Sequence, residues 1–187
     1  MKKTVVGLSV FLSLVFSFLI GFLPRVFAQD VTSSTIEPKV NRGDVMVGGS
    51  LGFSYSTYSK LTFELNPTVE YFVADRLSLG GTVGLMFSES YNSYLVGPSA
   101  TYYFWKEDRL TANVGAEIRF GYFEYDNGAG RVTENATTGR FRMGLNYFLT
   151  PEVSLGPVFT LDKAFGSGQS STAIDNSTLK VQFQIHL

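Results

Sequence analysis

The last ten residues of the chain alternate strictly between apolar and polar side chains. Leu179, Val181, Phe183, Ile185 and Leu187 take every second position, and Thr, Lys, Gln and His residues lie between them. Successive side chains of a β-strand point to opposite faces, so this segment predicts a strand with one apolar and one polar face. The same two-residue period recurs along most of the chain after residue 43, which indicates an all-β fold.

The first 28 residues have the pattern of an export signal. Lys2 and Lys3 precede an almost unbroken apolar run from Val5 to Leu23, and Val26 and Ala28 stand at the −3 and −1 positions of a cleavage site. We therefore predict that residues 1–28 are a signal peptide cleaved after Ala28. An uncleaved membrane anchor is the alternative reading of the long apolar run.

Composition removes several function classes. The formal net charge is −1 and the chain has no cysteine, which excludes disulfides and thiolate chemistry. No basic patch indicates nucleic acid as a partner. Residues 29–43 are polar without alternation and predict a flexible periplasmic lead-in. Beyond the signal no apolar run approaches the roughly 20 residues of a spanning helix, so a membrane-inserted chain must use strands closed on themselves.

Alternating segments and two kinds of connection organise residues 44–187. The segments cover 44–55, 61–73, 77–88, 93–105, 110–124, 138–149, 153–161 and 178–187. Three short connections separate them in pairs, whereas the connections near 56–60, 88–93, 125–137 and 163–177 are mostly longer and rich in Ser, Asn, Gly and Thr. Short periplasmic turns and longer outer loops are typical of membrane barrels. The sequence predicts an eight-stranded antiparallel up-and-down transmembrane β-barrel with both termini on the periplasmic side.

Two features favour an apolar face that meets lipid over a secreted soluble barrel with an apolar interior. The polar face is crowded with Gly, Ser and Thr, which suit a narrow lumen. Aromatic residues gather where the segments end, as they do in the interfacial girdles of membrane barrels. The predicted interfacial aromatics are Tyr71, Tyr103, Trp105 and Tyr147 at the periplasmic end and Tyr55 and Tyr122 at the outer end.

Charged residues also fall on the predicted inner face, with balanced signs. They are Glu64, Glu70, Glu117 and Asp162 against Arg119, Arg140, Arg142 and Lys180. Because an unpaired charge is costly in a confined interior, we predict a structural network of salt bridges that plugs the lumen. A narrow or gated pore is the alternative.

No pattern of residues predicts an enzyme, a metal site or a cofactor. His186 is the only histidine, and it lies on the polar face without an adjacent His-x-Ser pattern to support general-base chemistry. We interpret it as an interior polar residue. The Gly-rich stretch at 126–130 lacks the ligand spacing of a calcium loop and the helix that follows a phosphate loop, so it predicts a hairpin turn.

The chain resembles the small eight-stranded outer-membrane β-barrel family, of the OmpX and OmpA-barrel type. The resemblance lies in the Tyr-Phe pairs at 71–72 and 147–148, each followed after a short turn by Ser-Leu-Gly, and in the alternating C-terminal strand. It implies a bacterial outer-membrane protein with a structural or surface-interaction role in envelope integrity or adhesion. Alternatives are a small pore for small solutes and an outer-membrane lipid-modifying enzyme. The implied partners are outer-membrane lipid and lipopolysaccharide, the barrel assembly machinery and a surface ligand bound through the outer loops. The family usually ends in Phe or Trp, whereas this chain ends in Leu187.

Overall fold

The structure is a computed structural model that describes residues 36–56, 60–89, 91–126, 130–165 and 176–187. Eight strands make up most of these residues. They are β1 (Val45–Ser56), β2 (Lys60–Ala74), β3 (Leu77–Ser88), β4 (Tyr91–Glu107), β5 (Leu110–Asp126), β6 (Arg131–Phe148), β7 (Val153–Phe165) and β8 (Asn176–His186).

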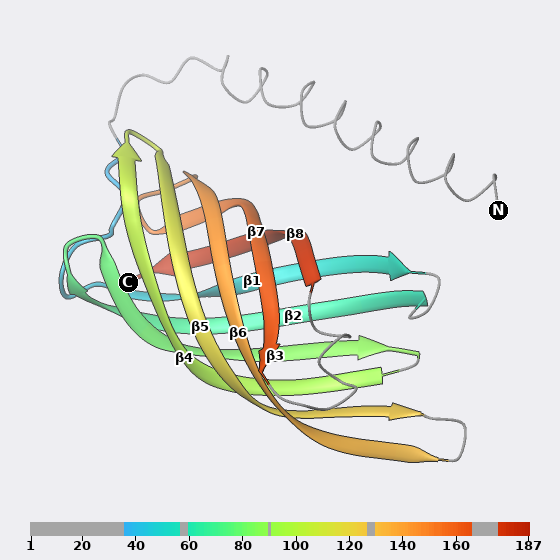
Figure 1. Cartoon of the computed structure of the whole chain (residues 1–187). Coiled ribbons are helices and arrows are strands. Elements are labelled where there is room, and N and C mark those ends of the chain that lie inside the picture. Colours follow the sequence, from blue (N-terminus) through green and yellow to red (C-terminus); the bar gives the residue numbers. More distant parts are fainter. Residues whose placement is uncertain (1–35, 57–59, 90, 127–129, 166–175) are drawn as a thin grey trace, which may run out of the picture. The chain divides into compact units, whose positions relative to one another are not determined.

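The strands form a closed antiparallel barrel in which each pairs with the next along the chain (Figure 1). β8 closes the barrel against β1, in a register that runs from Met46 opposite His186 to Leu51 opposite Val181. This confirms the predicted eight-stranded up-and-down topology. The carboxyl terminus lies at the same end as the short β2–β3, β4–β5 and β6–β7 connections, which we name the turn end. We name the opposite end the loop end.

The turn end is built from tight hairpins. Only Asp75 and Arg76 join β2 to β3, and only Asp108 and Arg109 join β4 to β5. Arg76 and Asp108 have φ angles of 65° and 42°, the left-handed conformation that matches a two-residue turn to the right-handed twist of its strands. β2 and β4 each carry a bulge shortly before these turns, which shifts the register by one residue.

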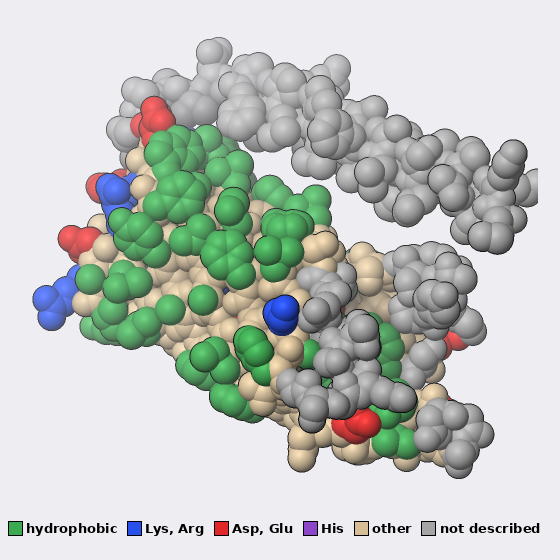
Figure 2. All heavy atoms as spheres, in the orientation of Figure 1, with side chains coloured by type: hydrophobic (Ala, Val, Ile, Leu, Met, Phe, Trp, Pro, Cys, Tyr) green, Lys and Arg blue, Asp and Glu red, His purple; other side chains and the backbone are tan. Residues whose placement is uncertain are grey.

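The apolar face of the sheet points away from the barrel axis. Leu145 on β6 and Phe159 on β7 are 43% and 40% exposed, whereas the neighbouring Asn146 is fully buried. Figure 2 shows apolar side chains over much of the visible wall. A soluble barrel has the opposite arrangement, with its apolar side chains packed inside, so the structure contradicts that alternative.

Six of the eight strands are longer than the sequence predicts, and β4, β5 and β6 are the longest. β4, β5 and β6 have 17, 17 and 18 residues, whereas β1 and β3 have 12 each. The predicted loop over 125–137 is therefore wrong, since Arg131–Thr137 pair with Phe120–Asp126. The prediction failed because this hairpin is polar on much of both faces, and strands without an apolar face lack the two-residue signal. Within the described ranges no helix is long and apolar enough to cross a membrane.

Candidate functional site in the barrel lumen

The eight charged residues predicted to face inward all lie inside the barrel. Glu64, Glu70, Glu117, Arg119, Arg140, Arg142 and Lys180 are each at most 8% exposed, and the Asp162 side chain is 7% exposed. Four carboxylates meet four cations, so the set is neutral. The strands bring these residues together because inward positions on different strands share the same narrow lumen.

Arg140 is the centre of the group of charges nearer the loop end. Its guanidinium donates from Nε and Nη2 to the two carboxylate oxygens of Asp162, at 2.7 and 2.8 Å. It also donates to Glu64 Oε1 at 2.6 Å and to Asn66 Oδ1 at 2.7 Å. Lys180 Nζ adds a second cation to Glu64 at 2.6 Å. Every charge in this group therefore has a partner of opposite sign, and the Arg–carboxylate pair is bidentate.

Glu70 is the centre of the group nearer the turn end. Its carboxylate accepts hydrogen bonds from Ser78 at 2.5 Å and from Ser99 and Thr101 at 2.9 Å each, and it pairs with Arg142. These donors come from three further strands, β3, β4 and β6. A carboxylate held by this many donors is fixed in position, because each donor would lose a charged acceptor if it moved.

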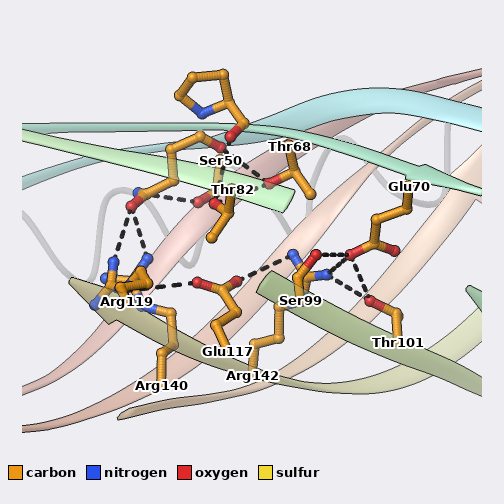
Figure 3. A network of polar contacts seen from close by, with 12 residues as sticks. Ser50, Thr68, Glu70, Thr82, Ser99, Thr101, Glu117, Arg119, Arg140 and Arg142 are labelled. Carbon is orange, nitrogen blue, oxygen red and sulfur yellow. Dashed lines mark hydrogen bonds and ion pairs between the residues drawn. The ribbon is translucent and has the colours of Figure 1, made fainter. Parts of the chain in front are cut away.

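Glu117 joins the two groups. Its carboxylate lies 3.4 Å from Arg142 Nη1 and 3.8 Å from Arg119 Nε. Figure 3 shows Glu117 between these two guanidinium groups. Arg119 in turn reaches Asp162 at 2.5 Å. The eight charges therefore form one connected network rather than separate pairs.

Two small cavities lie beside this network. One cavity beside Glu64, Arg119 and Arg140 measures about 20 Å³. A second, beside Thr68, Arg142 and Gln184, measures about 10 Å³. A cavity must measure about 10–15 Å³ to hold one water molecule. The first cavity can therefore hold one water molecule, and the second is at the lower limit for one.

An aromatic layer lies inside the barrel at the turn end. Phe72, Tyr103 and Phe148 are fully buried and surround His186, with ring centroids 6.1, 6.5 and 5.1 Å from the imidazole. Met46 completes the cluster. The interpretation of His186 as an interior residue agrees with this position.

Tyr103 corrects a prediction, because it lies inside the barrel and not at a membrane interface. The Tyr-Phe pairs at 71–72 and 147–148 place Tyr outward and Phe inward, but in β4 the phase is reversed, with Tyr103 inside and Phe104 outside. The buried Tyr103 hydroxyl donates to Gln184 Oε1 at 3.4 Å. The repeated dipeptide suggested a common role, but the alternation within β4 determines the face.

The other predicted interfacial aromatics are on the outer wall where the structure describes them. Tyr71 and Tyr122 are 50% and 40% exposed, and Tyr147 is half-buried. Trp105 pairs with the outward-facing Ala112 because the bulge in β4 skips Phe104. The side chain of Tyr55 lies outside the described residues.

Residues Ile36–Gly43, which we name the strap, cross the turn end. Val40 is fully buried against the aromatic layer, and its carbonyl accepts from the Arg76 amide at 2.8 Å. Lys39 pairs with Glu152 and Glu37 pairs with Lys106, both at 3.1 Å. The strap thus contacts the β2–β3 and β6–β7 turns and the end of β4. The sequence predicts a flexible lead-in here, since one buried valine in a polar segment produces no periodic signal.

The structure adds two groups that the sequence analysis did not select. Asn66 accepts from Arg140 and donates to Glu64 at 3.0 Å, so it is an uncharged member of the network. The inward positions of Phe72 and Phe148 follow from the alternation with Tyr71 and Tyr147, and that signal was available. Within the described part of the chain, no three His, Cys, Asp or Glu side chains are placed to hold a metal ion. The stretch at 126–130 lies partly outside the described residues.

No family model and no curated protein matches this chain. Solved structures do match. The N-terminal β-barrel domain of Pseudomonas aeruginosa OprF is 15% identical, covers 78% of this chain and 98% of its own, and superposes with a TM-score of 0.58. This chain has the fold of the small eight-stranded outer-membrane β-barrels. Neisserial surface protein A has the same fold. It is 15% identical, the match covers 76% of this chain and 95% of its own, and the TM-score is 0.55.

Within this outer-membrane barrel fold, the likeness extends to the architecture alone. Both matches cover nearly all of the matched structure's own chain, so the shared part is the whole barrel and not one hairpin. At 15% identity the match shows the fold alone, so no role of a lumen residue is transferred from it.

Proposed function

We propose that this protein is inserted in a bacterial outer membrane, with both termini periplasmic, as a closed barrel with a structural or surface-interaction role. The predicted signal peptide at 1–28, the outward apolar wall and the fold shared with outer-membrane barrels support the location. Export followed by insertion of closed strands satisfies every backbone group inside the bilayer. Lipids of that membrane and the barrel assembly machinery are the partners that this location implies.

The buried charge network is the observation that supports a scaffold over a pore. Arg140 and Arg142 lie with their carboxylate partners inside the lumen, and the two cavities beside these arginines measure about 20 and 10 Å³. An ion that passed would have to separate buried charge pairs that lack water to replace their partners. The aromatic layer and Val40 add an apolar barrier at the turn end.

The long β5–β6 hairpin supports a role in contact with other surfaces. β6 continues for six residues beyond Thr137, its outermost residue paired with β7, and at about 3.3 Å a residue this is roughly 20 Å. Tyr125 donates to Glu134 at 2.9 Å across this extension, and Arg131 lies 3.9 Å from Glu124. Figure 1 shows the hairpin reaching beyond the neighbouring strands. It is the part of the described chain best placed to meet a ligand outside the cell.

Single-channel recording in planar bilayers tests the closed lumen. The wild-type protein, refolded and verified by its heat-modifiable gel shift, should give no steady openings. A double variant, Arg140→Ala with Arg142→Ala, empties part of the axis and should leak if it folds. Steady large openings of the wild type would contradict the scaffold and favour the small-pore alternative.

Shortening the hairpin separates adhesion from scaffolding. A variant that replaces residues 123–134 with an Asn-Gly turn removes the extension together with the pairing of Phe123–Tyr125 to the start of β4, and it leaves the rest of the barrel wall intact. An adhesin should lose attachment of cells to their target surface while the membrane stays resistant to detergent. A purely structural protein should keep any attachment, and only deletion of the whole gene should make the envelope leak.

A further inference from the structure

A hollow of about 620 Å³ lies on the outside of the barrel wall. It spans β5 to β8, and the side chains that point outward around it are Ala116, Phe141, Leu161, Lys163, Phe165 and Ser177. The rest of its lining comes from Gly139 and from residues whose side chains point into the lumen. Four of these six outward side chains are apolar, so the hollow suits a hydrocarbon chain.

The hollow depends on a glycine. A Cβ atom at Gly139 would come within 2.8 Å of the Phe165 ring, so the ring lies directly over the Gly139 backbone. Phe165 is 56% exposed and Phe141 is 42% exposed, so both rings border the hollow without filling it. A larger residue at 139 would displace Phe165 and change the shape of the hollow.

Lys163 is a cation on this otherwise apolar surface. It pairs across strands with Gly139, and along β7 it stands between Leu161 and Phe165, which are 45% and 56% exposed. Among the described residues Lys163 has no ion pair, although it is exposed. A lysine on the lipid-facing side of a barrel is costly unless its charge finds a partner near the membrane boundary.

The position of Lys163 along its strand places it near that boundary. It lies ten residues after Val153, where β7 leaves the turn end. At about 3.3 Å a residue and a tilt of about 40°, this corresponds to roughly 25 Å along the barrel axis, the height of the apolar band. The ammonium group therefore stands at the level of lipid headgroups on the loop-end side.

We infer that Lys163 and the hollow beside it bind a phosphorylated glycolipid of the outer leaflet, with one acyl chain between Phe141 and Phe165 and a phosphate on Lys163. This inference rests on the proposed orientation, in which the loop end faces outward. Charge complementarity selects an anionic lipid, and phosphate is a strong acceptor for a lysine ammonium group. The outward loop end places this site in the outer leaflet, and the three probes of the experiment separate a phosphorylated glycolipid from a phospholipid of that leaflet.

Native mass spectrometry of the folded barrel in detergent tests the site. The probes are bisphosphorylated lipid A, lipid A without phosphates, and phosphatidylglycerol. Wild type should retain bisphosphorylated lipid A about tenfold better than Lys163→Gln, while Lys163→Arg should bind like wild type. Ala116→Phe, which fills the hollow, should weaken binding as well, and Ala112→Phe on the same strand outside the hollow is its matched control.

Each result of this experiment supports or overturns one part of the inference. Equal binding by Lys163→Gln, or by lipid A without phosphates, would overturn the role of Lys163. Phosphatidylglycerol bound as tightly as lipid A would overturn the glycolipid assignment. Weaker binding by Ala112→Phe equal to that of Ala116→Phe would overturn the hollow as the acyl site. A heat-modifiable shift is measured on every sample, since its absence in the wild type would contradict the proposed membrane barrel instead.

Discussion

Arg140 and Asp162 face each other in register across β6 and β7, and two hydrogen bonds of 2.7 and 2.8 Å join guanidinium to carboxylate inside the barrel. Glu64 shares the same guanidinium from the opposite side of the lumen. Removing Arg140 leaves four buried carboxylates with only three buried cations in the network. Loss of one partner from a buried pair costs about 3–5 kcal/mol.

We therefore expect Arg140→Ala to lower the free energy of unfolding by about 3–5 kcal/mol. Urea unfolding in lipid vesicles, followed by the fluorescence of Trp105, the only tryptophan, measures this. Arg140→Lys keeps the charge but loses the bidentate geometry, so its loss should be smaller. An Arg140→Ala variant as stable as wild type would show that water reaches these carboxylates.

Val40 holds the strap against the aromatic layer. Burial of a valine side chain contributes about 1.5–3 kcal/mol, and an aspartate here would place a charge among Phe72, Tyr103 and Phe148. We expect Val40→Asp to release the strap, so that trypsin cleaves after Lys39 and Arg42 at least tenfold faster. Val40→Ile is the control and should stay protected. Unchanged cleavage of Val40→Asp would mean that the polar contacts alone hold the strap.

The outward face is tested at two depths. Leu145 and Leu149 are both apolar and 43% and 49% exposed, but Leu145 lies within β6 and Leu149 just past its turn-end limit. Leu145→Arg should cost about 2–4 kcal/mol in bilayers, whereas Leu149→Arg near the interface should cost about 0–1 kcal/mol. Unfolding titrations in vesicles compare the two. Equal losses of stability for the two variants would contradict the prediction that lipid surrounds the outer face of β6.

Acid should loosen one strap contact. A hydrogen bond from Lys39 lowers the pKa of Glu152, which lies in the β6–β7 turn. A lowered pKa in the folded state means that the contact is present above the ordinary carboxyl range and is lost as the pH falls through the lowered value. The amide resonance of Lys39 should therefore shift in acid, and the shift should disappear in Glu152→Gln. A titration unchanged by that substitution would exclude Glu152 as its source.

Local alternation was enough to predict both faces of the barrel. Lipid outside and a polar lumen inside demand opposite side chains at neighbouring positions, so Leu145 and Asn146 could be assigned without a structure. The partners within the lumen could not be predicted. Whether Arg140 or Arg119 takes the bidentate place on Asp162 depends on how the strands are staggered, which is a property of the closed barrel.

Where the alternation shifts or is absent, the sequence predicted the wrong face or gave no prediction. Tyr103 and Phe104 repeat the order of Tyr71 and Phe72 with the opposite phase, so the dipeptide alone misassigned Tyr103. The sequence of the strap has no two-residue alternation. Its packing depends on the turn end of the barrel, which is built from three turns that are distant in the sequence. The extension of β5 and β6 is polar, so composition predicted a loop where cross-strand hydrogen bonds form.

The most direct test of the whole account is which solvent meets each side of the wall. The chain has no cysteine, so single nitroxide labels can be placed at Leu145, at Phe159 and at Thr133 on the extended hairpin. In vesicles, labels at Leu145 and Phe159 should collide with oxygen and be shielded from a water-soluble nickel complex, and the label at Thr133 should show the reverse. Free access of the nickel complex to Leu145 and Phe159 would contradict a barrel with lipid outside and its charges within.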